Sequence, residues 1–261
     1  MNETNPFDSP HAKLNEPEKK KWRPTVVEIG VTCVLFAILA GLLLPATTSS
    51  PRTGSRIGTS MNHLKQIGLA LHNYHDTHGS LPPAVVTDAD GRPLYSWRVL
   101  LLPMLEQKPL FDEFDLSQPW DSPTNRPLVA QMPSAYESPF LSVADMPGMT
   151  TYLAVVDPDA RQTIMLPRSG RALSQVPGTL GEATLVVEQI PASPVIWTKP
   201  VDVSPFELIR AAKIDQNDDS ACIVLLGDAA VKWIALSDPQ QLKASLFCEA
   251  ADRADPMPAG D

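Results

Sequence analysis

The pattern of apolar positions separates a uniformly apolar run near the start of the chain from a longer mixed region. Residues 26–44 are apolar on all sides and contain one charged residue, Glu28. At 1.5 Å rise per residue, a helix of this length spans slightly less than the ~30 Å hydrocarbon layer of a bilayer. The pattern therefore predicts one transmembrane helix over 24–45.

The region after residue 60 begins with helical periodicity and continues with strand-like segments. Leu64, Ile67 and Leu71 fall on one stripe, which predicts a long helix over 61–77 with Ser60 as its N-cap. The further predictions are a strand and turn at 85–95, short helices at 97–105 and 125–130, strands at 151–156, 183–189, 221–226 and 229–234, and a last helix at 238–249. This order predicts an α+β head, in which the long helix packs on an antiparallel sheet.

Three polar segments surround these elements. Residues 1–23 combine prolines with Asn, Glu and Lys, which predicts a disordered tail, and 251–261 predict a second one. Residues 46–60 are rich in Pro, Gly, Ser and Thr, which predicts a flexible tether rather than a helix. The folded head is then expected over 61–250.

The distribution of basic residues predicts the orientation of the apolar run. Lys19, Lys20, Lys21 and Arg23 precede it, whereas arginines are sparser after it. The positive-inside rule places the N-terminus in the cytoplasm and the head on the periplasmic, extracytoplasmic side of the cytoplasmic membrane. A cleaved secretory signal is the alternative, but a cut after Ala46 would leave a bulky leucine where a small residue is preferred.

Charge and cysteine content restrict the function further. The net charge of −9 argues against nucleic acid as a partner, because phosphate binding needs a basic surface. Cys33 lies in the apolar run, so only Cys222 and Cys248 could form a disulfide bond within the head. Two buried thiols are the favoured prediction, and a bridge in an oxidising compartment is the alternative.

Candidate catalytic and metal-binding groups lack a supporting pattern. Four histidines occur at 63, 72, 75 and 78, yet no acidic or cysteine ligand follows at a metal-binding spacing. Packed or hydrogen-bonded histidines are therefore expected. No nucleophile motif and no phosphate-binding loop occurs, so we predict no enzymatic activity, no metal and no cofactor.

Aromatic residues near cations form the one candidate ligand site. The residues are Trp97, Arg98, Trp120, Trp197 and Lys199. Aromatic faces with nearby cations suit sugars or planar ligands, whereas core tryptophans beside exposed charges are the more common arrangement.

An ordered series of motifs resembles the DUF1559 family, which is abundant in planctomycete bacteria. The motifs are MNHLKQIGLALHNYHDTHGSLPP at 61–83, SWRVLLLP at 96–103, PWDSPTNR at 119–126, TYLAVV at 151–156, LVVE at 185–188 and WTKP at 197–200. Members of this family are type IV pilin-like (pseudopilin-like) proteins and are also grouped as solute-binding proteins. The resemblance covers roughly 25–236 and implies a pilin-like head.

The chain also departs from the family pattern. Glu28 matches the glutamate that pilin subunits use in assembly, but Arg23 and Pro24 replace the processing glycine and the first mature residue. This replacement argues against prepilin processing. Near the C-terminus, Asp228-Ala229 replaces the Asp-Gly of the family.

Together these observations predict a membrane-tethered, non-catalytic structural or interaction protein. Its expected partners are the lipid bilayer and other proteins of the membrane or envelope. The alternative is an extracytoplasmic module that binds sugars or wall fragments.

Overall fold

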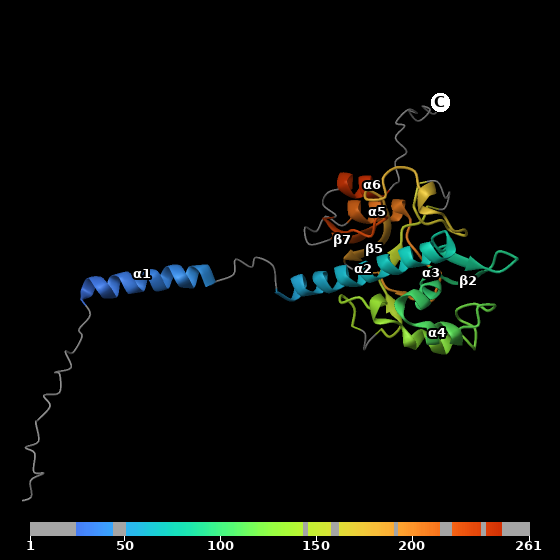
Figure 1. Cartoon of the computed structure of the whole chain (residues 1–261), viewed down its shortest axis with the longest axis horizontal. Helices are drawn as coiled ribbons and strands as arrows, with labels where there is room; N and C mark the ends of the chain where they lie inside the picture. The colour runs from blue at the N-terminus through green and yellow to red at the C-terminus, as the bar shows by residue number, and fades with distance from the viewer. Residues whose placement is uncertain are drawn as a thin grey trace, which may run out of the picture. The chain divides into compact units, whose positions relative to one another are not determined.

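The computed structural model divides the chain into two compact units, Met1–Thr48 and Ser49–Asp261. Each is described by itself (Figure 1). The residues that the structure describes are 25–43, 51–142, 146–157, 162–190, 193–214, 221–235 and 239–246. The predicted tails at 1–23 and 251–261 lie outside these residues.

The described part of the first unit is one helix, α1 (Val26–Leu43), of 18 residues. It coincides with the predicted apolar run and includes Glu28, whose side chain is outside the described part. When only the described residues are considered, no helix is long and apolar enough to cross a membrane. The transmembrane helix over 24–45 therefore stays a prediction.

The second unit, the head, is a mixture of helices and antiparallel strands, which confirms the α+β class. Its α-helices are α2 (Pro51–His78), α3 (Trp97–Leu100), α4 (Lys108–Glu113), α5 (Pro205–Ile214) and α6 (Pro239–Leu246). Its 3-10 helices are η1 (Leu102–Leu105), η2 (Arg126–Gln131), η3 (Ser134–Tyr136) and η4 (Leu173–Gln175). Its strands are β1 (Val85–Thr87), β2 (Pro93–Ser96), β3 (Met149–Thr150), β4 (Tyr152–Ala154), β5 (Thr184–Ile190), β6 (Val195–Ile196), β7 (Ala221–Leu226) and β8 (Val231–Ala235).

The long helix α2 begins ten residues earlier than predicted, so the flexible tether over 46–60 is wrong for residues 51–60. Pro51 is compatible with the first position of a helix, where its missing N–H has no partner to lose. The Thr59 hydroxyl donates to the Ser55 carbonyl (3.1 Å), which satisfies it inside the helix. Ile57 packs against the core and Ser60 is fully buried, so tertiary contacts offset the poor helix propensity of this segment.

The central sheet has the strand order β4-β5-β7-β8, and every neighbouring pair is antiparallel. All six residues of β7 are buried, because helices cover both faces of this strand. Ile223 and Leu225 point into the larger core, which also contains Leu64 and Leu71 of α2. Figure 1 shows α2 crossing the head beside the sheet.

The opposite face of the sheet is covered by α5 and α6. Cys222, Val224 and Ile234 from β7 and β8 pack there with Leu208 of α5 and Leu242 of α6. Helix α5 was not predicted from the sequence, although it forms part of this cover. Successive side chains of β7 point to opposite faces of the sheet, as the pleat of a strand requires: Ile223 and Leu225 to the α2 side, Cys222 and Val224 to the α5 and α6 side.

Close packing between α2 and β7 depends on a glycine. A Cβ atom placed on Gly68 would lie 2.8 Å from Leu225 Cδ1. The small residue therefore lets the helix backbone approach the sheet directly.

The predicted hairpin near the C-terminus is confirmed, with a strained turn between β7 and β8. Ala229 has φ 66°, in the left-handed region that glycine adopts without strain. The Asp228 carboxylate accepts the Ala230 N–H (2.9 Å), which holds the turn. The alanine that replaces the family glycine thus keeps the turn conformation at a cost in stability.

Candidate functional site

A buried ion pair between Arg98 and Asp202 links several segments of the head. Arg98 directly follows Trp97 at the start of α3, and its side chain is fully buried. The guanidinium Nη2 donates to Asp202 Oδ1 (2.9 Å) and to the Tyr152 carbonyl (2.7 Å), while Nη1 donates to the Ser96 hydroxyl (2.6 Å). This side chain therefore joins β2, β4 and the segment before α5.

Oδ1 of Asp202 accepts all the hydrogen bonds that the described residues donate to this carboxylate. Besides Arg98, the Trp97 indole Nε1 (3.1 Å) and the Ala154 N–H (2.8 Å) donate to Oδ1. Oδ2 is buried and has no hydrogen-bond partner among the described residues. Burial raises the pKa of Asp202, whereas Arg98 and the other donors act to lower it.

A second polar cluster surrounds Glu188 on β5, which is also fully buried. Its carboxylate accepts hydrogen bonds from the hydroxyls of Ser60, Ser138 and Thr151, the last at 2.6 Å. The Tyr152 hydroxyl donates to the Ser60 hydroxyl (3.3 Å). Burial and the neighbouring Glu188 charge raise the pKa of Tyr152. The cluster fastens α2 to the sheet through polar contacts.

Asn125 organises the loop that contains the PWDSPTNR motif. Its side-chain Nδ2 donates to three carbonyls, of Asp115, Gln118 and Pro119, at 2.9 to 3.2 Å. Its Oδ1 accepts the Asp115 N–H (2.9 Å). The Asn125 amide therefore stabilises the local chain path and has little capacity left for a ligand.

The five residues of the predicted ligand site do not line one cleft. Trp97, Arg98 and Trp197 are fully buried, and the Trp197 Nε1 donates to the Val129 carbonyl (2.9 Å). Trp120 is half-buried and Lys199 is exposed, with the Lys199 Nζ 5.9 Å from the centre of the Trp120 ring. Only this last pair is accessible from solvent.

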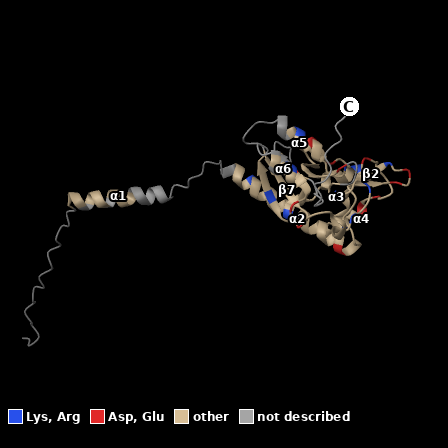
Figure 2. Ribbon diagram, turned by 90° about the horizontal axis from the view of Figure 1, so that it is seen from above, with Lys and Arg blue, Asp and Glu red and all other residues tan. Residues whose placement is uncertain are grey.

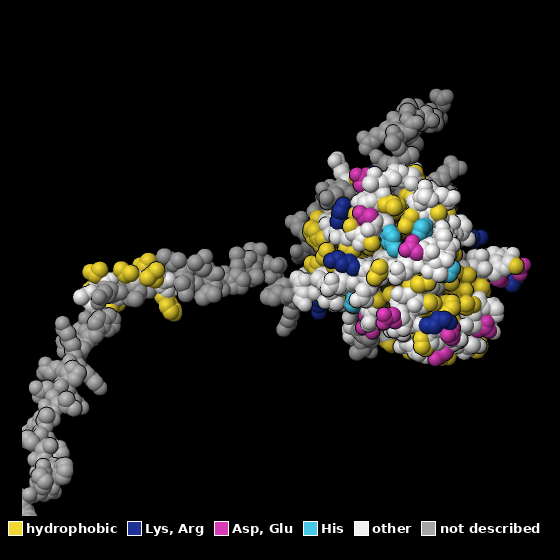
Figure 3. All heavy atoms as spheres, viewed as in Figure 1, with side chains coloured by type: hydrophobic (Ala, Val, Ile, Leu, Met, Phe, Trp, Pro, Cys, Tyr) yellow, Lys and Arg dark blue, Asp and Glu magenta, His cyan; other side chains and the backbone are white. Residues whose placement is uncertain are grey.

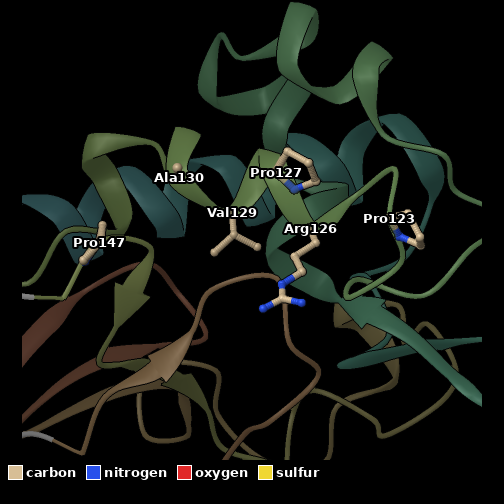
Figure 4. A pocket seen from close by; sticks show the side chains of 6 residues that line it. All are labelled: Pro123, Arg126, Pro127, Val129, Ala130 and Pro147. Atoms are coloured by element: carbon tan, nitrogen blue, oxygen red, sulfur yellow. The ribbon is translucent and has the colours of Figure 1, made fainter.

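Two surface hollows occur on the head, and none of the five residues lines either of them. The larger, about 470 Å³, is open and is lined by Pro123, Arg126, Pro127, Val129, Ala130 and Pro147. Figure 4 shows its proline rings around η2, with the Arg126 side chain reaching away from the helix backbone. The smaller, about 260 Å³, is lined by Asp202, Ser204 and Glu207 together with apolar residues.

The histidines of α2 make hydrogen bonds within the head. His63 Nδ1 lies 2.8 Å from the Glu137 carbonyl, and His72 Nε2 lies 3.0 Å from the Gly227 carbonyl. His75 Nε2 accepts the Leu173 N–H (3.2 Å), and His78 stacks on Tyr74 at 4.0 Å between ring centres. Figure 3 shows histidine side chains gathered on one face, beside acidic ones. In the described part of the chain, no group of His, Cys, Asp and Glu could hold a metal ion.

The cysteines and the surface charges add no reactive centre to the described head. Cys222 is a buried, unbridged thiol, and burial raises its pKa to about 12, while Cys248 lies outside the described residues. Figure 2 shows acidic and basic residues close together on the hairpin that contains β2, where Asp90 and Arg92 pair at 3.5 Å. Such exposed pairs contribute little stability.

The sequence matches the model of a known protein family. Residues 49–184, just over half of the sequence, match the model of the family described as Protein of unknown function (DUF1559). The chain belongs to the DUF1559 family, which confirms the resemblance drawn from the motifs. No curated protein and no solved structure matches the chain significantly.

The motif residues therefore have a structural explanation in this head. Ser96, Trp97 and Arg98 of SWRV, Asn125 of PWDSPTNR and Glu188 of LVVE are all buried and bonded to other segments. Sequence reasoning missed the role of Asp202, which follows the WTKP motif without being part of it and lies 104 positions from Arg98.

Proposed function

We propose that the protein is a membrane-tethered, non-catalytic structural or interaction protein of the DUF1559 type. One observation supports it most. Seven large hydrophobic residues of α1 are between 49% and 87% exposed (Figure 3). Such a surface is unfavourable in water by roughly 25 cal/mol per Å² of apolar area, so a bilayer or an apolar partner must cover it.

The polar interior of the head supports the non-catalytic part of the proposal. Arg98, Asp202 and Glu188 are buried charges, which active sites often use, but here they bond to backbone groups and hydroxyls of several segments. A head whose buried charges are taken up by internal hydrogen bonds suits a protein that presents its surface to partners on the extracytoplasmic side. The N-terminus then remains in the cytoplasm, as the basic residues before α1 predict.

Membrane extraction tests this proposal directly. The full chain, expressed in a bacterial host, should remain in the membrane pellet after washing with alkaline carbonate. Leu35→Arg on α1 places a charge in the apolar run and should shift much of the protein to the supernatant, because arginine at a helix centre costs about 3 kcal/mol of insertion.

The matched control is Leu69→Arg on α2, since Leu69 is an exposed leucine (62%) of the head. This variant should stay in the pellet like the unmodified chain. Protease added to spheroplasts should digest the head, and the intact mass should equal that of the full sequence. Release of the unmodified chain by carbonate would refute the tether, and protection of the head from protease would refute its orientation.

A second candidate, the binding of sugars or wall fragments, is favoured by the Trp120–Lys199 pair. An aromatic face beside a cation, both reachable from solvent, is a surface on which a sugar ring could stack. Calorimetry of the full chain against a glycan panel tests it, with Trp120→Ala as the variant. Heat signals that Trp120→Ala abolishes would support this candidate, and flat traces for the unmodified chain would eliminate it.

A further inference from the structure

We infer that His75 of α2 and the segment 171–176 form a pH-sensitive contact, which holds this segment in place at neutral pH and releases it when His75 is protonated. The segment contains the 3-10 helix η4. The contact is the hydrogen bond from the Leu173 N–H to the His75 Nε2 (3.2 Å). Both partners belong to the head, so the device does not depend on the membrane tether.

The direction of this hydrogen bond fixes the protonation state of the ring. A backbone N–H can only donate, so the His75 Nε2 must accept with its lone pair. Only the neutral ring has such a lone pair, because both nitrogens of a protonated imidazole carry hydrogen. Protonation of His75 therefore replaces the hydrogen bond by two N–H groups that face each other. The His75 side chain is 22% exposed, so protons can reach it from solvent.

The other three histidines of α2 use their rings in the opposite sense. Each places a ring nitrogen 2.8 to 3.0 Å from a backbone carbonyl: His63 at Glu137, His72 at Gly227 and His78 at Tyr74. A carbonyl can only accept, so these nitrogens carry hydrogen, and a protonated ring still donates to the same carbonyl. Histidine is the side chain that ordinarily changes its charge between pH 5 and 8. Acidification in this range thus leaves these three contacts in place and removes the one that His75 makes.

The charged groups that face this contact do not supply another acceptor for the Leu173 N–H. On the same helix, Asp76 Oδ1 lies 3.5 Å from the His75 Nδ1, on the far side of the ring, and the Asp76 side chain is 79% exposed, so solvent screens its charge. The neighbouring histidines at 72 and 78 lie one turn away in each direction. On the facing segment the charged residue is Arg171, whose guanidinium donates to a carbonyl of its own loop at 2.7 Å.

The part of the segment that His75 holds is small and partly apolar. The chain before it stays attached, since the Leu81 N–H donates to the Arg171 carbonyl (2.9 Å). Leu173 and Val176 are partly buried against the larger core. Loss of the His75 contact therefore lets η4 open locally and uncovers apolar side chains, while the central sheet keeps its own hydrogen bonds. Local opening of this kind requires less free energy than unfolding of the whole head.

Hydrogen–deuterium exchange of the full chain in a neutral detergent tests the inference at about pH 7.5 and about pH 5. Labelling times are scaled to cancel the pH dependence of the chemical exchange rate, so that the remaining difference reports opening of the structure. Peptides that contain η4 should exchange about tenfold faster at the lower pH, because one hydrogen bond is lost. Peptides from β7 should exchange equally at both pH values.

His75→Gln is the deciding variant, because a glutamine amide oxygen can accept the Leu173 N–H and does not titrate. Its η4 peptides should exchange equally at both pH values. His78→Gln is the matched control, since His78 lies one turn further along α2 and contacts a carbonyl. It should keep the pH response of the unmodified chain. A second measurement is an NMR titration of the unmodified chain, in which the Leu173 amide and the His75 ring signals should shift with the same midpoint.

Three exchange results would overturn the inference. They are the absence of a pH response in η4 of the unmodified chain, a response that His75→Gln retains, or an equal loss of protection in β7, which would indicate unfolding of the whole head. If His75→Gln opens η4 at both pH values, the NMR titration decides. Equal midpoints for Leu173 and His75 would then support the inference, and unequal midpoints would overturn it.

Discussion

Removing Arg98 should destabilise the head more than almost any other single polar change. Arg98→Met keeps a long side chain of similar length but leaves the Asp202 carboxylate buried without its cation. Breaking one partner of a buried ion pair costs about 3–5 kcal/mol, and the Tyr152 carbonyl loses two N–H donors as well. We expect the free energy of unfolding to fall by about 4 kcal/mol, a large share of the 5–15 kcal/mol typical of a domain.

The assay is urea unfolding of the full chain, followed by far-ultraviolet circular dichroism and tryptophan fluorescence. Arg168→Met, at an exposed arginine, is the control and should change stability by less than about 0.5 kcal/mol. Asp202→Asn and the double variant Arg98→Met/Asp202→Asn complete a double-mutant cycle. Because the double variant has no unpaired charge, we expect a coupling energy of about 2 kcal/mol or more.

If the loss of unfolding free energy in the double variant equals the sum of the two single losses within about 0.5 kcal/mol, the coupling between Arg98 and Asp202 is refuted. Additivity would mean that the two side chains are stabilised independently and that their contact contributes nothing. If Arg98→Met lowers the free energy of unfolding by less than about 1 kcal/mol, the expected loss of about 4 kcal/mol is refuted.

Three further predictions concern other parts of the head. Glu188→Leu should lower the free energy of unfolding by about 3 kcal/mol in the same urea assay, because three buried hydroxyls lose their acceptor, and a loss below about 1 kcal/mol would contradict this role. Ala229→Gly should raise that free energy by about 1 kcal/mol, since glycine adopts φ 66° without strain; a decrease would show that the turn is not strained. In a chain whose other cysteines are replaced by alanine, Cys222 should react with a thiol-specific disulfide reagent at pH 8 only as fast as the head unfolds. The side chain is buried, and its pKa of about 12 lies well above pH 8, so little of the reactive thiolate is present. Rapid reaction without urea would be inconsistent with this burial.

Local signals in the sequence predicted the elements that local interactions determine. The periodicity of Leu64, Ile67 and Leu71 predicted the packed part of α2, and the Gly227-Asp228 turn predicted the hairpin of β7 and β8. Both signals act within a few residues, so neither needs knowledge of the rest of the fold.

Interactions between distant segments could not be read in this way. Residues 51–60 have low helix propensity, and only the burial of Ser60 and the packing of Ile57 reveal why they are helical. The same limit applies to the candidate site. A tryptophan beside an arginine looks alike in a cleft and in a core, and only Asp202, far along the chain, shows that Trp97 and Arg98 belong to the core.

The contact between α2 and β7 also determines when this protein can fold during synthesis. α2 is the first element of the head, whereas β7, on which it packs, follows more than a hundred residues later, and His72 contacts the carbonyl of Gly227, 155 positions away. In a ribosome-bound chain that has not yet released β7, the part of α2 that packs on the sheet stays uncovered. Such late-forming contacts slow folding and expose unfinished chains to aggregation, so we expect chains that stop before β7 to aggregate more readily than the complete chain.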